Sequence, residues 1–579
     1  MVPNLFSLLI INCFLVLIFW SGAKAELFTA ISEVEPLLVT HKRIIDDLDH
    51  YIQQEEKRLF TLKKQLSIYK REHDKAMEDI PNYLGNPINA FTLIKRLTAD
   101  LDYIEQTIKV GTEYIKNITM NHDDVKYPAI EDLTGAAQAL TRLQETYYLD
   151  VTELAEGVLN GVTYSTPMTA GDCFELGRAL YNEEDYKNGL AWMLVSLQKY
   201  KKENEPYFFN ETTILDYISF SYYLLGDVTN ALEWTKKLLE VDPNHSRARN
   251  NIPHYQKAIA EEEVKLAKKK RGDVGEESQQ VVTVPEELSE FMKEKKMYEH
   301  LCRGEMDIPP EIAKKLYCRY LTENHPFLKL APIKMEYAYL KPDIVIFHDV
   351  MSDDEIKFIQ EAAKPRFKRA VVHDARTGKL VPAPYRISKS AWLKDDEADV
   401  IERVSQRVAH MTGLSMYSAE ELQVVNYGIG GHYEPHYDFA RKAESAFKKF
   451  HGNRIATVLF YMSDVAQGGA TVFTKLGLSL FPIKGAAAFW LNLHPSGEGD
   501  LATRHAACPV LRGSKWVSNK WLHQGGQELL KPCNLEYQGE AIIRPIPKPI
   551  PKTSRYILIL KPYLTKSIYR KYNKDFSIE

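Results

Sequence analysis

Residues 422–438 have the sequence LQVVNYGIGGHYEPHYD, in which a run of apolar and β-branched residues leads through a glycine-rich turn into a second short extended stretch. Comparable short runs, separated by glycine-containing turns, occur at 344–347, 456–460 and 487–491. Several short strands at this spacing are typical of a β-sandwich or barrel. We predict a jelly roll, also called a double-stranded β-helix, over residues 335–538.

The same stretch carries two candidate metal ligands, and a third lies later in the chain. Side chains two positions apart in a strand point to the same face, so His436 and Asp438 can converge on one ion. His505 is the candidate third ligand. Two histidines and one carboxylate on one face of an octahedron are the ligand set of non-haem Fe(II) oxygenases. His432 competes for the role of ligand, but it follows two glycines, where a regular strand is not expected.

A lysine near the third ligand strengthens this interpretation, because a His-x-Asp pair alone is more often a polar pair on the surface. Lys515 lies ten residues after His505. A buried cation beside an iron with open positions needs an anionic partner. A dicarboxylate co-substrate would bind the metal through one end and the ammonium group through the other. The alternative is an exposed lysine in a turn.

Six motifs, in the same order along the chain, carry a family resemblance: residues 131–137 (EDLTGAA), 385–392 (YRISKSAW), 427–438 (YGIGGHYEPHYD), 468–473 (GGATVF), 496–500 (SGEGD) and 504–523 (RHAACPVLRGSKWVSNKWLH). They closely resemble the catalytic α subunits of the collagen prolyl 4-hydroxylases. The resemblance extends over nearly the whole mature chain to about residue 538, and so long a match in order is highly specific.

The resemblance implies an enzyme, a 2-oxoglutarate-dependent dioxygenase that hydroxylates C4 of proline in X-Pro-Gly sequences of procollagen-like chains. Fe(II) is the expected metal cofactor and L-ascorbate the expected reductant. The co-substrates are 2-oxoglutarate and O2, and the products include succinate and CO2. Two alternatives are a non-catalytic scaffold that holds collagen-like chains, and the same oxygenase chemistry on another acceptor such as lysine.

The resemblance also implies roles for individual residues. The expected Fe(II) ligands are His436, Asp438 and His505. Lys515 is expected to pair with the distal carboxylate of 2-oxoglutarate and His523 to lie near its C1 carboxylate, with further contacts from Tyr427 and Thr471. The expected peptide contacts in the same domain are Tyr433, Arg454 and Trp521.

The length and composition describe an ordinary globular protein with several domains, and the predicted fold class is multidomain α + β. At 579 residues the chain is too long for one hydrophobic core. Hydrophobic residues make up 45% and charged residues 26%, which excludes a wholly disordered chain and a polytopic membrane protein. The net charge, from 74 basic and 78 acidic residues, is −4, so no overall field favours nucleic acid as a partner.

The first residues predict entry into the secretory pathway through a signal peptide, residues 1–25. Residues 5–20 are almost continuously apolar, and the alanines at 23 and 25 form a cleavage site before Glu26. The apolar run is short for a spanning helix, which needs ~20 residues, and a signal anchor is the alternative. No later stretch is long enough to span a bilayer. We expect a mature chain in the endoplasmic reticulum lumen, with glycosylation acceptors at Asn117, Asn210 and Asn244.

The cysteines predict local disulfides rather than a disulfide-built scaffold. Of six cysteines, Cys13 lies in the signal peptide. In an oxidising lumen, closeness in sequence predicts two bonds, Cys302–Cys318 and Cys508–Cys533. Cys173 is then left as a buried free thiol.

Residues 26–130 are predicted to form long helices and a dimerisation domain. Apolar residues from Ile31 to Tyr69 recur at alternating three- and four-residue steps, and a second stripe runs from Ile94 to Ile108. Such a stripe is typical of a coiled coil, so we favour self-association over a helical hairpin within one chain. The resemblance implies a homodimer of this kind in an α2β2-type assembly, with protein disulfide isomerase as the β subunit.

Residues 131–262 are predicted to be a tetratricopeptide-like domain that binds the peptide substrate. The segment from Gly226 to Pro243 matches the second half of such a repeat. Tyrosines are dense here and suit a proline-rich peptide, because aromatic surfaces dock polyproline II helices. The alternative is that they pack between helices. The candidate peptide contacts are Tyr181, Tyr186, Tyr217 and Tyr223, and Phe220 stands where the family commonly has tyrosine.

Two further segments complete the predicted organisation. Residues 263–334 are predicted to be a charged linker together with the segment of Cys302 and Cys318, because the stretch up to about residue 290 is rich in Lys, Glu and Gln and lacks apolar periodicity. Residues 539–579 form a Pro-, Lys- and Tyr-rich C-terminal extension outside the family pattern. We favour a disordered extension over a docking arm for another chain.

Overall fold

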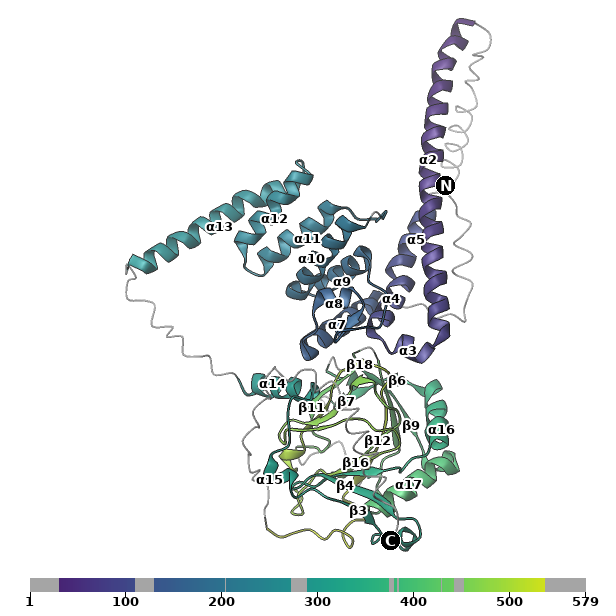
Figure 1. Ribbon diagram of the computed structural model, residues 1–579, viewed down its shortest axis with the longest axis vertical. Coiled ribbons are helices and arrows are strands. Elements are labelled where there is room, and N and C mark those ends of the chain that lie inside the picture. Colours follow the sequence, from purple (N-terminus) through teal and green to yellow (C-terminus); the bar gives the residue numbers. More distant parts are fainter. Residues whose placement is uncertain are drawn as a thin grey trace, which may run out of the picture. The chain divides into compact units, whose positions relative to one another are not determined.

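The structure is a computed structural model (Figure 1). It describes residues 31–109, 130–203, 205–271, 289–373, 380–382, 385–428, 430–441 and 452–536. The chain separates into two compact units, one of residues 1–74 and 107–110 and one of residues 75–106 and 111–579. The predicted signal peptide, Asn117 and the C-terminal extension after 539 lie outside the described residues.

The N-terminal region is helical, as the apolar stripes predict. One 48-residue helix dominates it, and polar side chains of Asp79 and Asn86 cap the two helices that follow. On the long helix, Ile52, Leu59 and Leu66 of the predicted stripe are about half exposed. The helices are α2 (Ile31–Glu78), α3 (Ile80–Leu84), α4 (Pro87–Leu97) and α5 (Ala99–Lys109).

Helix pairs follow, which confirms the predicted tetratricopeptide-like region. Each helix of the pairs begins at a side chain that accepts a hydrogen bond from the backbone: Thr169, Asp185, Asn210 and Asp227. The elements are α7 (Ile130–Tyr147), α8 (Val151–Ala155), β1 (Val158–Leu159), β2 (Val162–Thr163), α9 (Ala170–Asn182), α10 (Tyr186–Lys202), α11 (Glu211–Leu224), α12 (Val228–Val241) and α13 (Ser246–Arg271).

Small residues let the first pair pack closely. A Cβ added to Gly177 of α9 would lie 3.1 Å from the carbonyl oxygen of Gly189 in α10. Two hydrophobic clusters fill the space around this pair, one shared with α7 and one shared with α11 and α12. Cys173 is a buried free thiol inside the first of them, as predicted.

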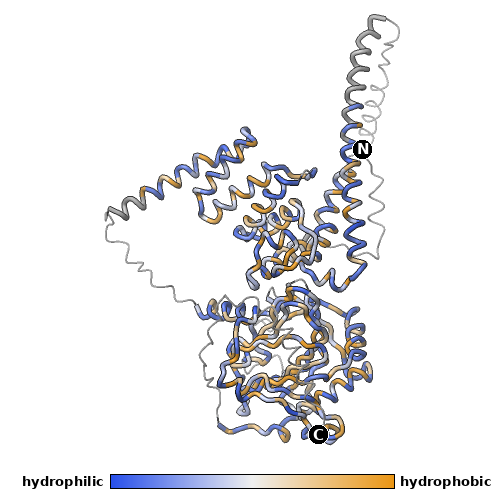
Figure 2. The backbone as a smooth tube through the Cα atoms, in the orientation of Figure 1, coloured by the Kyte–Doolittle hydropathy of each residue, from blue (hydrophilic) through white to orange (hydrophobic). Residues whose placement is uncertain are grey.

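The C-terminal region is a sandwich of antiparallel sheets, which confirms the predicted jelly roll. The large sheet has nine strands in the order β3-β4-β5-β16-β12-β19-β10-β9-β6, the small sheet has four in the order β11-β17-β14-β15, and β13 pairs with β18 beside them. Hydrophobic residues recur along these strands (Figure 2). The strands are β3 (Cys318–Leu321), β4 (Ile333–Tyr339), β5 (Ile344–His348), β6 (Lys368–Arg369), β7 (Val371–His373), β8 (Leu380–Pro382), β9 (Ser388–Leu393), β10 (Leu422–Tyr427), β11 (Tyr433–His436), β12 (Arg454–Tyr461), β13 (Gln467–Gly468), β14 (Thr471–Phe473), β15 (Leu478–Leu480), β16 (Ala487–Leu491), β17 (His505–Ala507), β18 (Val510–Arg512) and β19 (Trp516–His523).

Helices cover both sides of this sandwich. Helices α16 (Asp353–Ala363) and α17 (Asp399–Thr412) pack on the large sheet through a core that includes Ile359, Val404 and Val458. A second core, with Phe473 and Trp490, lies between the two sheets. Helices α14 (Glu290–Cys302) and α15 (Pro310–Ala313) precede the first strand.

The predicted charged linker contains more structure than its composition indicated. Helix α13 continues to Arg271, past the predicted boundary at 262, and the sandwich begins with β3 rather than at residue 335. Strand β3 pairs along its whole length with β4, which begins at Ile333. A short edge strand needs few apolar residues, so it left no periodic signal in the sequence.

Both predicted disulfides, Cys302–Cys318 and Cys508–Cys533, are wrong. Cys302 is bonded to Cys508, 206 residues away, and Cys318 and Cys533 are exposed free thiols. The end of α14 packs on the small sheet, in a cluster with Val472 and Ala506, whereas β3 lies at the edge of the large sheet. Packing thus decided the pairing, because the entropy of loop closure rises only slowly with loop length.

Two of the predicted glycosylation acceptors are exposed. Asn210 caps α11 by accepting a hydrogen bond from the backbone of Thr213, and Asn244 lies in the turn before α13. In the part of the chain that the structure describes, no helix has the length and hydropathy that a membrane span requires.

Candidate active site

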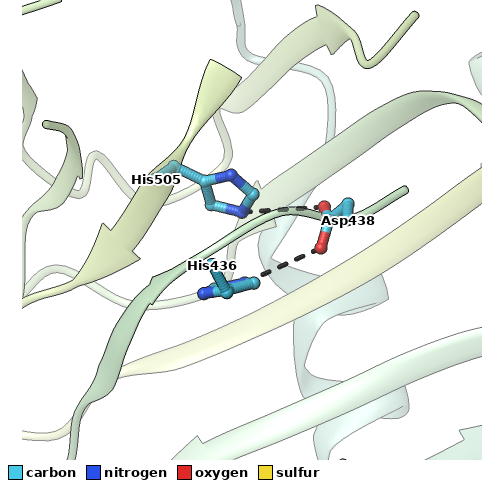
Figure 3. Close-up of side chains that lie close together, drawn as sticks. All are labelled: His436, Asp438 and His505. Atoms are coloured by element: carbon cyan, nitrogen blue, oxygen red, sulfur yellow. Dashed lines mark ion pairs between the residues drawn. The ribbon is translucent and has the colours of Figure 1, made fainter. Parts of the chain in front are cut away.

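The candidate metal ligands lie on two neighbouring strands of the small sheet. His436 ends β11 and His505 begins β17, and the two residues are register partners across the antiparallel pair. Their ring centroids are 4.4 Å apart. Asp438 follows β11 two residues after His436, so it faces the same side, as Figure 3 shows. The two side chains therefore share one side, as the period-2 argument from the sequence predicted.

The three side chains converge on one point. His436 Nε2 lies 3.7 Å from Asp438 Oδ1, and His505 Nε2 lies 3.6 Å from Asp438 Oδ2. One ligand atom from each residue lies within 4.8 Å of the other two. The carboxylate and the His505 ring are buried, and the His436 ring is largely so. This spacing suits a single ion between them.

Backbone carbonyl groups fix the two imidazole rings. His436 Nδ1 lies 2.8 Å from the carbonyl oxygen of Glu434, and His505 Nδ1 lies 2.9 Å from that of Thr503. A carbonyl oxygen only accepts, so each Nδ1 carries the hydrogen and donates. Each Nε2 then keeps its lone pair and faces the centre, as metal-binding histidines require.

The carboxylate is held by a chain of hydrogen bonds from the large sheet. Thr457 Oγ1 and Trp521 Nε1 donate to Asp438 Oδ2 at 2.8 and 2.9 Å. Asn492 donates to Thr457 Oγ1 at 2.9 Å, and its own oxygen accepts from Trp490 Nε1. Thr457, Asn492 and Trp490 carried no signal in the sequence, because buried polar residues in strands are recognised only when their partners are known.

The electrostatics favour the metal-binding forms of Asp438 and His436. Burial alone would raise the pKa of Asp438, but His505, His436, Arg454 and the hydrogen bond from Trp521 together lower it to about 2. Burial, followed by the neighbouring His505, lowers the pKa of His436 well below its usual value. A carboxylate and neutral imidazoles are the forms that bind Fe(II), so the donor set fits this metal.

His432, the competing candidate, is not part of this cluster. Its ring is buried at the turn between β10 and β11, and its carbonyl oxygen accepts a hydrogen bond from Ile387. Burial lowers the pKa of His432 to about 3. The turn after the two glycines therefore directs this ring away from the metal ligands.

Lys515 is buried, with 1% of its surface exposed, which excludes the alternative of an exposed lysine in a turn. Its Nζ lies 5.1 Å from the centre of the Tyr427 ring. Among the described residues it has no anionic partner, and burial lowers its pKa to about 7. An unpaired buried ammonium group is costly, so this position suits an anionic ligand.

Of the two further predicted 2-oxoglutarate contacts, Thr471 is buried and Tyr427 is partly buried. A Cβ on Gly469, two residues before Thr471, would lie 3.4 Å from Lys515 Cδ. Thr471 Oγ1 accepts a hydrogen bond from the hydroxyl group of Tyr461 at 3.0 Å. Burial raises the pKa of Tyr427 to about 12, so this ring keeps its hydroxyl proton. Tyr461 is a candidate contact that the sequence did not reveal.

Trp521 and Arg454 both contact Asp438, and His523 is linked to Arg454 through Glu420. His523 is fully buried, with Nδ1 2.7 Å from the carbonyl oxygen of Gly452 and Nε2 2.8 Å from Glu420 Oε1. Arg454 donates to the same Glu420 carboxylate at 2.5 and 2.9 Å and lies 3.9 Å over the Trp521 ring. Both ring nitrogens of His523 thus already have partners within the protein.

Tyr433 packs directly on a metal ligand. Its ring stacks on the His436 ring at a centroid distance of 3.5 Å, and the Arg386 guanidinium lies 4.8 Å from the Tyr433 ring. Of the three predicted peptide contacts in this domain, Tyr433 and Arg454 are partly buried and Trp521 is buried.

The predicted tyrosines of the helical repeats gather across three helices. The Tyr181 ring contacts Tyr186 and Tyr217 edge to face, at 5.3 and 4.9 Å. Tyr223 packs against Tyr255 of α13 at 5.0 Å. All of the four predicted rings are partly exposed, so they are not simply core residues between helices.

Three regions of the chain match known families. Residues 30–161 match the N-terminal region of the prolyl 4-hydroxylase alpha subunit, and residues 170–261 match the prolyl 4-hydroxylase peptide-substrate-binding domain. Residues 422–523 match the 2OG-Fe(II) oxygenase superfamily. This last match contains all three candidate ligands.

Full-length relatives agree with these matches. The chain is 47% identical over 521 residues to prolyl 4-hydroxylase subunit alpha-2 of Caenorhabditis elegans, which covers 89% of this chain and 94% of that protein. It is 46% identical to prolyl 4-hydroxylase subunit alpha-1 of Gallus gallus, over 88% of this chain and 99% of that protein. The corresponding protein of Homo sapiens is 45% identical, over 89% and 97%.

Proposed function

The chain belongs to the prolyl 4-hydroxylase alpha-subunit family, and from this premise we propose that it hydroxylates C4 of proline in X-Pro-Gly sequences of collagen-like chains. It is a 2-oxoglutarate-dependent dioxygenase, so O2 and 2-oxoglutarate are consumed and succinate and CO2 are released. One observation carries the proposal: two histidines and a carboxylate converge within 4.8 Å in a sandwich that also buries Lys515 without an anionic partner among the described residues.

The ligand residues would hold Fe(II) through His436 Nε2, His505 Nε2 and the Asp438 carboxylate. Bound iron supplies the activation of O2, which side chains alone do not provide. The protein supplies fixed geometry, since both rings donate to carbonyl groups and Asp438 accepts from Thr457 and Trp521. Such outer hydrogen bonds orient the ligands and raise metal affinity.

The Lys515 ammonium group would pair with the distal carboxylate of 2-oxoglutarate, with Tyr427 and Thr471 lining the same pocket. The charge-assisted bond would form where water is excluded, because Lys515 is buried and Tyr427 covers it. His523 would act on the C1 carboxylate only through Glu420 and Arg454, because both of its ring nitrogens are engaged.

The tyrosines of the helical repeats would bind the proline-rich chain outside the active site. Tyr181, Tyr186, Tyr217 and Tyr223 are partly exposed and lie on neighbouring helices, which supports this role. Proline-rich chains adopt polyproline II with a low ordering cost, and aromatic rings pack on it with few hydrogen bonds. Tyr433, beside His436, would contact the proline that is oxidised, with Arg454 and Trp521 acting from behind Asp438.

Two α subunits would pair through residues 26–130. Ile52, Leu59 and Leu66 lie on the predicted heptad stripe and remain about half exposed in the single chain. Covering such a stripe with a second helix removes apolar surface from water. A β subunit, protein disulfide isomerase, would complete an α2β2-type assembly.

The remaining parts of the proposal concern the cellular setting. Removal of the signal peptide at residues 1–25 would leave the chain in the endoplasmic reticulum lumen, where Asn117, Asn210 and Asn244 can be glycosylated. The bond between Cys302 and Cys508 suits an oxidising compartment. L-Ascorbate would act as the reductant that restores the iron after uncoupled turnover.

Succinate release with (Pro-Pro-Gly)-type peptides tests the function, with and without co-produced protein disulfide isomerase. We expect succinate and 4-hydroxyproline in equal amounts, with the hydroxyl group located by mass spectrometry of the peptide. Lysine oxidation without proline oxidation would contradict the proposed acceptor. Peptide binding with no 2-oxoglutarate turnover in the iron-loaded protein would indicate a scaffold instead.

A further inference from the structure

The turn that carries Lys515 is only partly held by the sandwich. On the sandwich side, Ser463 Oγ donates to the carbonyl oxygen of Ser514 at 2.8 Å and accepts from Trp516 N, and Tyr427 N donates to the carbonyl oxygen of Lys515. These bonds fix the backbone of Lys515 and of the residues on either side of it, but not Gly513 or Arg512 before the turn. The preceding strand, β18, pairs only with the two-residue strand β13 among the described strands.

The segment before the turn is held by the N-terminal helices instead. Gly513 N donates to the carbonyl oxygen of Gly85, between α3 and α4, at 2.7 Å. Arg512 Nη1 donates to Asn82 Oδ1 of α3 at 3.2 Å. The two backbones touch, because a Cβ added to Gly85 would lie 2.8 Å from Gly513 Cα. The contact therefore requires glycine at residue 85.

Helix α7 holds the other end of the same segment. The hydroxyl group of Tyr147 donates to the carbonyl oxygen of Pro509 at 2.6 Å. Between the two anchors, the Leu511 side chain is buried in the hydrophobic cluster of the helical region, with Phe91 and Leu143. The Leu511 side chain of β18 is thus part of the hydrophobic core of the helices.

The same helix also contacts the loop before the first metal ligand. Arg142 Nη1 donates to the carbonyl oxygen of Gly430 at 3.1 Å. Gly430 has a φ of 52°, and an added Cβ would lie 2.9 Å from the carbonyl oxygen of Ala139. The loop at Gly430 leads into β11 and His436. Helix α7 therefore lies against both loops that flank the proposed co-substrate pocket.

We propose that α3, α4 and α7 form part of the 2-oxoglutarate site, with Gly85 and Tyr147 as positioning residues for the Lys515 turn. The inference rests on the proposed role of Lys515 in binding 2-oxoglutarate. A buried side chain has little freedom of its own, so its Nζ moves with its backbone. Loss of an anchor would shift the ammonium group relative to the metal, whereas His436 and His505 stay paired across β11 and β17.

The test removes one hydroxyl group from the full-length protein. Tyr147→Phe is expected to raise the KM and the Kd for 2-oxoglutarate by about twofold to tenfold, the range for one lost hydrogen bond. The Kd is measured by calorimetry with manganese(II) in place of iron. The KM for the peptide, kcat at saturating 2-oxoglutarate and bound metal should stay unchanged. Tyr148→Phe is the matched control, since the neighbouring ring is exposed and lies under the Arg303 guanidinium.

A second variant tests the other anchor, Gly85, in case loss of the Tyr147 hydroxyl group changes neither folding nor 2-oxoglutarate binding. Gly85→Ala forces the two backbones apart and should raise the Kd further. The same clash should lower the thermal midpoint, so the Kd is measured at a temperature at which the variant is still folded. An unchanged Kd in both variants, or a parallel change in peptide KM, kcat and metal content, would overturn the inference. Succinate release without proline hydroxylation would overturn only the proposed acceptor, because the Kd comparison needs no peptide.

Discussion

The metal centre and the tyrosine surface of the helical repeats are held in different ways. At the metal centre, directional hydrogen bonds fix every ligand: carbonyl groups hold both imidazole rings, and Thr457 and Trp521 hold Asp438. In the repeats, Tyr181 and Tyr217 are held mainly by ring contacts. Chemistry at one atom needs fixed geometry, whereas a repetitive chain can be bound by a surface with little directional demand.

Loss of a metal ligand should give the largest effect and tests the first half of this comparison. His436→Ala is expected to lower 2-oxoglutarate turnover by more than about 100-fold, beyond the 10–100-fold typical of losing an outer partner of a metal ligand. Metal content after dialysis and succinate release measure it. His410→Ala, on α17, is the control, because its ring stacks on His325 instead. A chelator should abolish activity and added Fe(II) restore it.

Removal of the buried ammonium group should affect one substrate only. Lys515→Met is expected to raise the Kd for 2-oxoglutarate about 10–100-fold, as for hydrogen bonds to charged groups, while metal content stays unchanged. Lys520→Met is the matched control. That lysine is also buried but pairs with Asp395 at 2.9 Å, so its loss should lower stability and leave 2-oxoglutarate binding intact. Equal effects of the two variants on the Kd would refute the assignment of Lys515.

A change in the tyrosine surface should be smaller and confined to the peptide. Tyr217→Ala is expected to raise the KM for a long proline-rich peptide about threefold to tenfold, since an aromatic contact contributes ~0.5–1.5 kcal/mol. The kcat at saturating peptide and the Kd for 2-oxoglutarate should not change. Tyr417→Ala removes an exposed ring from the sandwich and serves as the control. A fall in kcat would mean that the two regions are not separable.

The pH dependence of co-substrate binding should give the smallest effect at neutral pH. Burial lowers the pKa of Lys515 to about 7, so its ammonium form is lost as the pH rises through that value. An anionic ligand favours the ammonium form. The Kd for 2-oxoglutarate should therefore rise with pH above about 7, by at most about tenfold per pH unit. Calorimetry in buffers of different ionisation enthalpy should detect proton uptake on binding, and no uptake at pH 8 would contradict this.

The local parts of the prediction were the successful ones. The alternation of a strand put His436 and Asp438 on one face, and the stripe from Ile31 to Tyr69 predicted the long helix α2. Each of these signals depends on residues a few positions apart, where the backbone geometry is known in advance. His505 and Lys515 were also proposed from the sequence; the pairing of β11 with β17 brings His505 beside His436, and Lys515 is buried in the turn before β19.

The failures involved partners that are distant in the sequence. The disulfide between Cys302 and Cys508 joins α14 to the small sheet, and nearness along the chain predicted other pairs. Glu420, Thr457 and Asn492 were missed because each is an ordinary polar residue until its buried partner is known. The edge strand β3 was taken for linker because its pairing with β4, not its composition, makes it a strand.

The sequence by itself determined the helices, the strand alternation and the identity of the groups that can bind iron and a keto diacid, because these follow from local geometry and side-chain chemistry. Only the tertiary structure decided which cysteines pair and which hydrogen bonds hold Asp438. It also decided that α3, α4 and α7 contact the segment before the Lys515 turn. Burial and hydrogen bonding over long distances along the chain are properties of the packed molecule, since their free energy depends on which surfaces meet.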